Sequence, residues 1–218
     1  NQASQQGPAL EDWTLEPILP ALGNRAEKFI QSRAGIEKPF LMYMPLTSPH
    51  TPLSVNQAWR GKSKLGLYAD FVMETDDIVG QVVGALDKAG LADNTLVLFT
   101  SDNGGLARGK PSHKLLGHNS NAPLRGSKAT IWEGGHRVPL IARWGDGTPA
   151  GSPITPAATS SALVGLQDIF ATLAELTGQT LKAEQGLDSQ SFVPALLQQN
   201  ATQLRNELLV LANDGVGW

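Results

Sequence analysis

A carboxylate and a carboxamide stand side by side at Asp102 and Asn103, directly after an apolar run that ends at Thr100. Both side chains offer hard oxygen donors, which suit Ca²⁺ or Mg²⁺ better than a soft metal. Together with Gly104 they also form a common tight-turn sequence, so a plain turn is the alternative interpretation. Two ligands are too few for a cation site, and further donors would have to come from elsewhere in the protein.

His50 lies between two prolines, Pro49 and Pro52, in a loop that follows another apolar run. Each proline fixes its own φ and pushes the preceding residue toward extended geometry, so the imidazole is carried on a stiff backbone. A stiff backbone suits a general acid or base, which must stay within hydrogen-bond reach of its proton partner. An ordinary loop histidine is the alternative.

Positive charge gathers between Arg108 and Arg137, in a chain whose formal net charge is −3. This Gly-rich interval contains six basic side chains and three histidines but only one acidic side chain, Glu133. Such a segment attracts an anion, and glycine lets the backbone approach that anion closely. A solvated basic loop is the alternative. The basic residues are Arg108, Lys110, Lys114, Arg125, Lys128 and Arg137, and the histidines are His113, His118 and His136.

The elements that must position these residues follow from the hydrophobic pattern. Four apolar runs between turn residues predict strands, and four further stretches predict helices. Strands that alternate with helices indicate an α/β fold with a mostly parallel sheet and helices on both faces. In such sheets the site lies where strands end and loops begin. We expect strands at 39–44, 95–100, 138–143 and 208–212, and helices at 25–33, 67–89, 164–177 and 192–198.

The helix expected over 67–89 has its apolar residues at spacings of three and four. Its opposite face carries Asp70, Glu74 and Asp77, which we interpret as a solvated face rather than as a ligand set. Residues 1–24 are polar, contain three prolines and are expected to form a loosely structured lead-in.

Composition excludes several classes of function. The chain has 218 residues, enough to bury a core, and its 17 basic against 20 acidic residues argue against general binding of nucleic acid or anionic membranes. It has no cysteine, which excludes disulfides, thiol catalysis and Cys-ligated metals. No apolar run approaches the ~20 residues that span a bilayer. A phosphate-binding loop ending in Gly61-Lys62-Ser63 is absent because Asn56 replaces its first glycine.

Taken together, five strings in order resemble the formylglycine-dependent sulfatases, which belong to the alkaline-phosphatase-like superfamily. The resemblance runs from about residue 25 to the C-terminus, and its strength comes from the order of strings that are individually weak. The strings are Lys38-Pro39-Phe40 with residues 48–53, residues 94–104, residues 123–128, residues 132–141 and residues 168–173.

The resemblance implies a role for each candidate residue. Asp102 and Asn103 match two ligands of a divalent cation, usually calcium, with magnesium as the alternative. His50 matches the histidine that contacts the sulfate ester and protonates the leaving alcohol. Lys128 matches the lysine that binds a sulfate oxygen and neutralises charge in the transition state.

The chain also departs from the family pattern. The nucleophile motif, Cys/Ser-x-Pro-x-Arg, does not occur, and neither do the early Asp-Asp ligands or the Gly-Lys-x-His segment. We therefore expect residues 1–218 to be the central to C-terminal part of a sulfatase catalytic domain, with the formylglycine in a missing N-terminal part. This chain alone is expected to be inactive and to need that part as a partner for stable folding. The family also implies a periplasmic or secreted location.

The resemblance predicts a sulfuric ester hydrolase that acts on sulfate monoesters, with sulfated carbohydrate as the expected substrate class. His118 and His136 lie near matched positions and are expected to line the substrate entrance. A phosphohydrolase of the same superfamily and a non-catalytic anion-binding relative are the two alternatives. Neither a nucleic acid nor a membrane is expected as a partner.

Overall fold

The protein was described with a computed structural model that covers residues 11–106, 118–146, 148, 150–197 and 204–211. These residues fall into two compact units. The first unit comprises residues 11–85 together with His118, and the second comprises the other described residues. Among the described helices, none has both the length and the apolar character that a membrane span requires.

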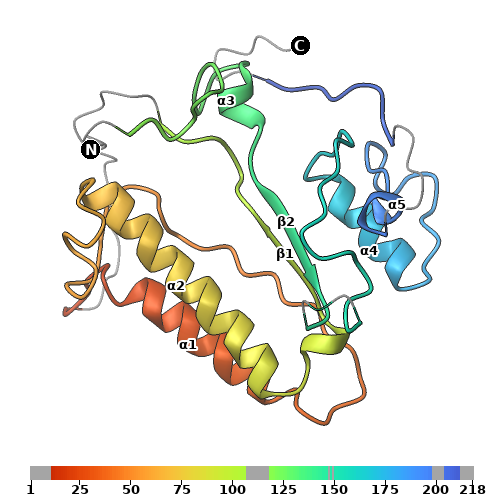
Figure 1. Ribbon diagram of the computed structural model, residues 1–218, viewed down its shortest axis with the longest axis horizontal. Coiled ribbons are helices and arrows are strands. Elements are labelled where there is room, and N and C mark those ends of the chain that lie inside the picture. Colours follow the sequence, from red (N-terminus) through yellow and green to blue (C-terminus); the bar gives the residue numbers. More distant parts are fainter. Residues whose placement is uncertain (1–10, 107–117, 147, 149, 198–203, 212–218) are drawn as a thin grey trace. The chain divides into compact units, whose positions relative to one another are not determined.

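Two helices, α1 (Ile18–Gln31) and α2 (Leu67–Lys88), lie side by side in the first unit (Figure 1). Their close approach depends on Gly23, because a Cβ there would lie 2.9 Å from Cδ1 of Ile78. The side chain of Gln81 donates a hydrogen bond of 2.7 Å to Glu27 across the same contact. α2 confirms the helix expected over 67–89, and its last residues belong to the second unit.

α1 begins seven residues earlier than the helix expected at 25–33, so residues 18–24 are helical rather than loosely structured. The reason is that its buried face already starts at Leu19 and continues through Gly23, Ala26 and Ile30 at helical spacing. Pro20 lies in the first turn, where a missing N–H costs no intrahelical hydrogen bond.

The core of the first unit joins both helices to the loop that connects them. Its fully packed members come from α1, the loop and α2, and the partly buried residues around them come from the loop. This packing places the loop against α2. The buried members are Leu19, Val55, Phe71 and Ile78, and the residues packed against them are Met44, Leu46, Leu53 and Trp59.

The interpretation of Asp70 and Glu74 as solvated is wrong, since each is only 1% exposed, whereas Asp77 is exposed as expected. Asp70 accepts hydrogen bonds of 2.8 Å from the backbone amides of Gly61 and Ser63. Burial by itself would raise the pKa of the Asp70 carboxyl, but the hydrogen bonds from Ser63 and Gly61 outweigh it and lower the pKa below its usual value.

Glu74 acts in the same way one turn further along α2. Its carboxylate accepts a hydrogen bond of 3.0 Å from the backbone amide of Asn56 and a second one from the Asn56 side chain. The two acidic residues therefore serve as acceptors for a loop whose amides have no helix or strand partner.

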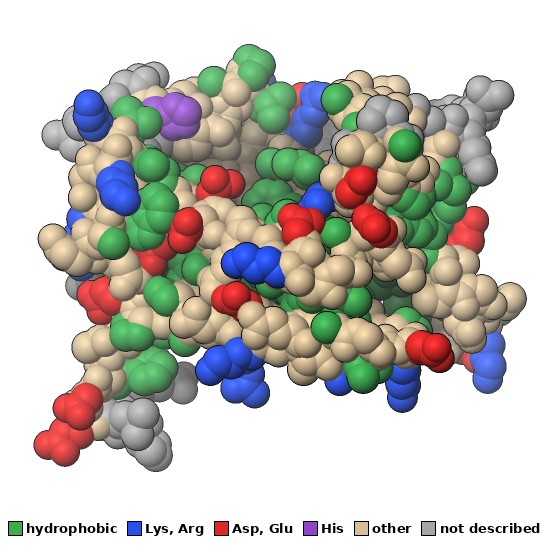
Figure 2. Space-filling view, turned by 60° about the horizontal axis from the view of Figure 1, so that its bottom comes forward, with side chains coloured by type: hydrophobic (Ala, Val, Ile, Leu, Met, Phe, Trp, Pro, Cys, Tyr) green, Lys and Arg blue, Asp and Glu red, His purple; other side chains and the backbone are tan. Residues whose placement is uncertain are grey.

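The residues expected to form a strand at 39–44 have no regular secondary structure, and no described residue pairs with them as a strand. Leu41 is 73% exposed and Tyr43 is 86% exposed. At 208–212, likewise, the described residues form no strand beyond one bridge residue, Leu211. Figure 2 shows hydrophobic side chains reaching the surface between charged ones. Apolar sequence alone predicted burial here, but burial also requires a neighbouring layer.

In the second unit, β1 (Leu96–Thr100) and β2 (Leu140–Trp144) form a two-stranded antiparallel sheet (Figure 1). Leu96 pairs with Trp144, and Thr100 pairs with Leu140. Both strands were expected, but the parallel pairing is not what the described residues form. The chain leaves β1 and re-enters β2 at the same end of the sheet, without the crossover that a parallel pair requires.

Short helices complete the second unit. The 3₁₀ helix η1 (Ala92–Asn94) leads into β1, and α3 (Glu133–His136) precedes β2. α4 (Asp168–Leu176) and α5 (Val193–Leu196) lie within the helices expected at 164–177 and 192–198. α4 starts four residues later than expected because the carboxylate of Asp168 accepts the amide of Gly165 at 2.7 Å.

Asp168 also anchors the last described segment. Its carboxylate is 2.5 Å from Nη2 of Arg205; the Asp168 side chain is buried and that of Arg205 is partly buried. The same guanidinium donates to the backbone carbonyl of Asp188 at 2.7 Å. A buried carboxylate with a charged partner and further amide donors fastens residues 204–211 onto α4.

Candidate functional site

The turn after β1 carries Asp102 and Asn103, the two predicted cation ligands. The hydroxyl of Ser101 donates a hydrogen bond of 3.0 Å to the carbonyl of Asn103. The side-chain amide of Asn103 donates to the carbonyl of Gly104 at 3.0 Å, which leaves its Oδ1 as an acceptor. The Asp102 carboxylate is exposed, and within the described residues it forms no hydrogen bond or ion pair.

This turn contacts α3 through backbone atoms. The amide of Gly104 donates to the carbonyl of Gly135 at 3.0 Å. A Cβ on Gly104 would lie 1.8 Å from the carbonyl oxygen of Gly134, so no side chain fits at this position. Glycine at 104 and at 134–135 therefore lets two peptide segments approach to hydrogen-bond distance.

Lys128 is tied to the same turn by its backbone. Its amide donates to the carbonyl of Gly105 at 2.9 Å. The amide of Gly105 donates in turn to Oδ1 of Asn121 at 2.9 Å, and Nδ2 of Asn121 donates back to the Gly105 carbonyl at 3.0 Å. The structure thus brings the segments of Asp102, Asn103 and Lys128 together. No hydrogen bond or ion pair occupies the ammonium of Lys128 in the described part of the chain.

Asn121 is a positioning residue that sequence reasoning missed. Besides its pair of hydrogen bonds to Gly105, its Nδ2 lies 3.3 Å from the carbonyl of Gly126, which it can also reach as a donor. One carboxamide therefore joins the turn after β1 to the loop that carries Lys128. The sequence signal was only that of an ordinary turn asparagine, two residues before Pro123.

The chemistry of this arrangement suits a hard cation beside an anion. Asp102 and Asn103 supply only oxygen donors, the type that Ca²⁺ and Mg²⁺ prefer. The described residues contain no group of three or more His, Asp or Glu side chains that could hold a metal ion. The two donors fit such a cation, and the rest of its coordination shell would come from outside the described residues. Lys128, whose backbone is hydrogen-bonded to the residue after Gly104, adds a positive charge to this part of the protein and favours an anionic ligand.

His50 belongs to the first unit, where its ring is exposed. Its Nδ1 lies 2.7 Å from the carbonyl of Thr51. Because a carbonyl can only accept, Nδ1 must carry the proton, and Nε2 is the nitrogen left to exchange a proton with a ligand. A hydrogen bond of 2.7 Å joins the hydroxyls of Ser48 and Thr75 and fastens this loop to α2. It stays a prediction that His50, Asp102 and Lys128 contact the same ligand.

The other two histidines were expected at the substrate entrance. His118 is exposed and directly follows residues outside the described ranges. His136 ends α3, immediately after the glycines that contact the Asp102 turn, and its Nε2 is buried with no hydrogen-bond partner among the described residues. Their contact with substrate stays a prediction.

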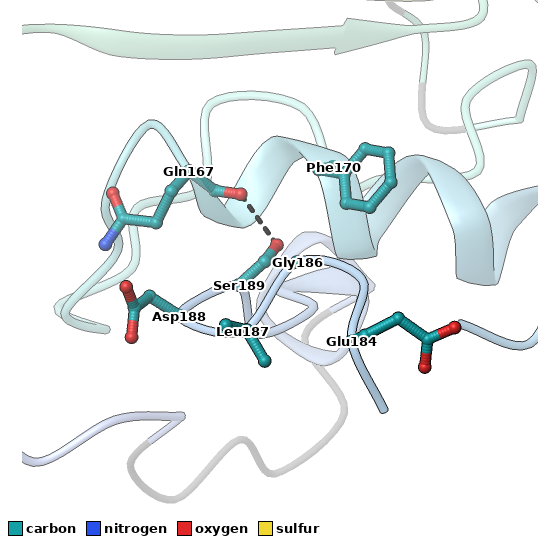
Figure 3. Close-up of a pocket in the computed structure, with 7 residues that line it drawn as sticks. All are labelled: Gln167, Phe170, Glu184, Gly186, Leu187, Asp188 and Ser189. Carbon is teal, nitrogen blue, oxygen red and sulfur yellow. Dashed lines mark hydrogen bonds between the residues drawn. The ribbon is translucent and has the colours of Figure 1, made fainter. Parts of the chain in front are cut away.

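A separate cavity of about 470 Å³ lies against α4 (Figure 3). Its lining includes two carboxylates, Glu184 and Asp188, and no basic side chain, so it does not suit an anion. The hydroxyl of Ser189 donates to the carbonyl of Gln167 at 2.6 Å, which fastens one wall to the start of α4. The lining residues are Gln167, Phe170, Glu184, Gly186, Leu187, Asp188 and Ser189.

Comparison of the sequence with known families gives one match, in which the family described as Sulfatase covers residues 3–179. An N-acetylgalactosamine-6-O-sulfatase of Bacteroides thetaiotaomicron is 35% identical over 194 residues, which are 87% of this chain and 36% of that protein. Human steryl-sulfatase is 37% identical over 183 residues, 84% of this chain and 30% of that protein. The chain thus spans about a third of the length of these relatives.

Solved structures give the same result. A Bacteroides thetaiotaomicron structure from work on glycosaminoglycan metabolism superposes with a TM-score of 0.82 at 32% identity, over 94% of this chain and 42% of that one. A Pseudoalteromonas sulfatase superposes with a TM-score of 0.75 at 28% identity, over 92% of this chain and 38% of that one. Ps i-CgsB, solved in complex with a neocarrahexaose, superposes with a TM-score of 0.69 at 31% identity, over 88% of this chain and 41% of that one. These neighbours have the alkaline-phosphatase-like fold, which confirms that part of the expectation.

Proposed function

Because the chain belongs to the sulfatase family, we propose that it forms the part of a sulfate monoester hydrolase that binds the cation and the sulfate group. The observation that carries the proposal is the hydrogen bond from the Lys128 amide to the Gly105 carbonyl. This bond joins the backbone of Lys128 to the residue that follows the turn with the two oxygen donors, which supports a shared site in a chain whose relatives are named as sulfatases.

Each residue of this site has a role that its chemistry supports. Asp102 and Asn103 hold the cation through a carboxylate oxygen and a carboxamide oxygen. Lys128 donates hydrogen bonds to a non-bridging sulfate oxygen and stabilises the negative charge that develops in the transition state. When bound, the cation would supply a fixed positive charge at the sulfate, and the nucleophile would be a formylglycine outside this chain.

His50 acts as the general acid in this proposal. Because Nδ1–H donates to the Thr51 carbonyl, Nε2–H of the protonated ring is the donor left for a ligand. Nε2 gives its proton to the bridging oxygen as the bond from that oxygen to sulfur breaks, so the alcohol leaves in neutral form. The neutral imidazole can then take a proton from water.

The finer features of the fold are part of the same proposal. We infer that the complete domain has a larger, mostly parallel sheet with helices on both faces, which the segment at 39–44 joins once a neighbouring strand is present. An N-terminal part would supply that neighbour, the nucleophile and the remaining cation ligands. The chain covers only about a third of its relatives, which supports a separate N-terminal part of the domain. We also propose that the complete protein is periplasmic or secreted.

Sulfated carbohydrate is the proposed substrate class. One relative is named for the 6-sulfate of N-acetylgalactosamine, and one structural neighbour was solved with a neocarrahexaose. Both the name and the complex involve sugars, and both proteins share more than 30% identity with this chain.

The test uses the full-length protein with 4-nitrophenyl sulfate and 4-nitrophenyl phosphate, which differ only in the transferred group. We expect hydrolysis of the sulfate, loss of activity with a chelator and recovery with Ca²⁺. Lys128→Ala is expected to lower kcat by about 10²–10³ because one charge-stabilising donor is removed.

Lys182→Ala, at an exposed position in the second unit, is the matched control and should leave kcat unchanged. Faster hydrolysis of the phosphate would instead support the phosphohydrolase, and turnover of neither compound would support a non-catalytic anion-binding protein.

A further inference from the structure

Among the described cations of the basic segment, one has neither a role in the proposed site nor an acidic partner. Arg108, Lys110 and Lys114 lie outside the described residues, Lys128 is assigned to the sulfate, and Arg137 pairs with Glu133 at 3.4 Å. The sixth is Arg125. It is exposed, and within the described part of the chain no carboxylate or carbonyl accepts its guanidinium N–H groups.

The Arg125 guanidinium is nevertheless ordered by an aromatic ring. Its Cζ lies 3.4 Å from the centroid of the Trp132 indole, so the planar cation stacks on the ring face. Trp132 itself is 41% exposed, which leaves the stacked pair at the surface. Stacking covers one face of the guanidinium but leaves the N–H groups along its edge for an acceptor.

The stacked pair belongs to the same backbone framework as Lys128. The carbonyl of Arg125 accepts the amide of Gly134 at 2.8 Å, and Lys128 lies three residues further along the same loop. Gly126 adopts a φ of +85°, and a Cβ there would lie 2.5 Å from Cβ of Trp132. A left-handed glycine therefore lets the loop turn tightly between the two cations and brings Trp132 against it.

A guanidinium held flat with a free edge matches a planar or tetrahedral oxyanion, which it can bind through two parallel hydrogen bonds. We propose that Arg125, oriented by Trp132, binds a second anionic group of the substrate while Lys128 binds the sulfate that is cleaved. This inference rests on the proposed function and narrows its substrate class to glycans with a second negative charge close to the scissile sulfate. The second group is a uronate carboxylate or another sulfate.

The test compares three disaccharides with the full-length protein. The first carries only the scissile sulfate, the second adds a uronate carboxylate on the neighbouring sugar, and the third adds a second sulfate there. Arg125→Lys keeps the charge but loses the bidentate edge, so it is expected to raise KM for a dianionic substrate about ten- to a hundredfold. For the monosulfated disaccharide, KM and kcat should stay unchanged.

Arg137→Lys is the matched control, since Arg137 is an exposed arginine of the same segment that already has an acidic partner. Trp132→Phe keeps an aromatic ring face and should retain most of the preference for dianionic over monosulfated disaccharides. Trp132→Ala should reduce that preference. Whichever dianionic substrate shows the KM effect identifies the second group as carboxylate or sulfate.

Equal effects of Arg125→Lys on all three disaccharides, or no effect on any of them, would overturn this inference and reduce the stack to a structural contact, while leaving the proposed function intact. Absence of turnover of every sulfate by the wild-type protein would instead overturn the proposed function, and this inference with it.

Discussion

At the scale of single residues, two buried acidic side chains of α2 bind the preceding loop, a role that the sequence pattern of the helix did not predict. Asp70 and Glu74 accept hydrogen bonds from the loop that precedes α2, at Gly61, Ser63 and Asn56. Glu74 lies three residues after Phe71 and four before Ile78, and Asp70 directly precedes Phe71, so both carboxylates border the apolar stripe of the helix. The loop wraps that side of the helix, so these carboxylates have amide partners instead of water.

Asp70→Asn is expected to lower the free energy of unfolding by about 1–3 kcal/mol at pH 7, because the amide group can no longer accept both backbone hydrogen bonds. The folded-state pKa of Asp70 is lower than the usual value of about 3.9. The contribution of the Asp70 carboxylate to the free energy of unfolding is therefore complete above a pH of about 3.9. It is lost as the pH falls through the folded-state pKa.

Denaturant unfolding of both proteins at pH 7 and at pH 3 measures this difference. The difference in the free energy of unfolding between the wild type and Asp70→Asn should be smaller at pH 3 than at pH 7. Asp77→Asn, on the same helix but exposed, is the control and should change stability little at either pH. A gap that widens on acidification would contradict the lowered pKa.

At the scale of elements, the candidate site depends on contacts between backbone segments rather than between side chains. β1 ends in a turn whose Gly104 amide donates to the Gly135 carbonyl within α3, and the carbonyl of the following residue, Gly105, accepts from the Lys128 amide. These contacts set where the cation ligands stand relative to the lysine loop. A change at a glycine should therefore affect ligand binding as well as folding.

Gly104→Ala is expected to weaken cation binding and to lower stability, because its Cβ would overlap the Gly134 carbonyl and force β1 and α3 apart. The loss of stability should be about 1–3 kcal/mol or more, as for overpacked interiors. Thermal unfolding with and without Ca²⁺ measures both effects.

Gly80→Ala on α2 is the matched control. A Cβ there meets no atom within 4 Å, and alanine favours the helix by up to about 1 kcal/mol. The control should therefore raise the melting temperature slightly and leave the Ca²⁺ effect unchanged. If Gly104→Ala behaved like Gly80→Ala, the close backbone contact would be refuted.

At the scale of the whole molecule, large apolar side chains lie at the surface of the described residues. Leu41 and Tyr43 in the segment at 39–44 and Leu209 near the last described residues are more than two-thirds exposed. Isolated surface leucines are ordinary, but Leu41 and Tyr43 alternate along a segment whose backbone has no strand partner in the described part.

The 218-residue chain on its own is expected to self-associate, and replacing both Leu41 and Tyr43 with serine should reduce that association with little loss of stability. In the full-length protein the same double substitution should cost about 2–5 kcal/mol per buried side chain, because a neighbouring layer covers them there. Sedimentation velocity and denaturant unfolding measure the two effects. A monodisperse chain of this length that unfolds cooperatively would count against the prediction.

The sequence predicted what local pattern determines. Apolar spacing placed α2, β1 and β2 within a few residues of their observed bounds. Residue chemistry singled out Asp102 and Asn103 as candidate cation ligands, whereas Lys128 was selected from six basic residues only by the family resemblance. The bond from Asn121 to Gly105, 16 residues away, could not be predicted, since any turn asparagine has the same local signal.

The direction of β2 depends on the route of a long connection, and burial at 39–44 depends on a neighbour outside the segment. Neither property can be obtained from local spacing.

The junction of Gly104, Gly105, Gly135 and Lys128 has a consequence for how specificity can change. Peptide groups, which do not vary with residue type, set the separation between the two charge-bearing loops. In the proposed site this portion is therefore preorganised, and adaptation to a new substrate would have to come from side chains that project beyond it. A designer who seeks altered selectivity should leave the glycines untouched and randomise the exposed rim.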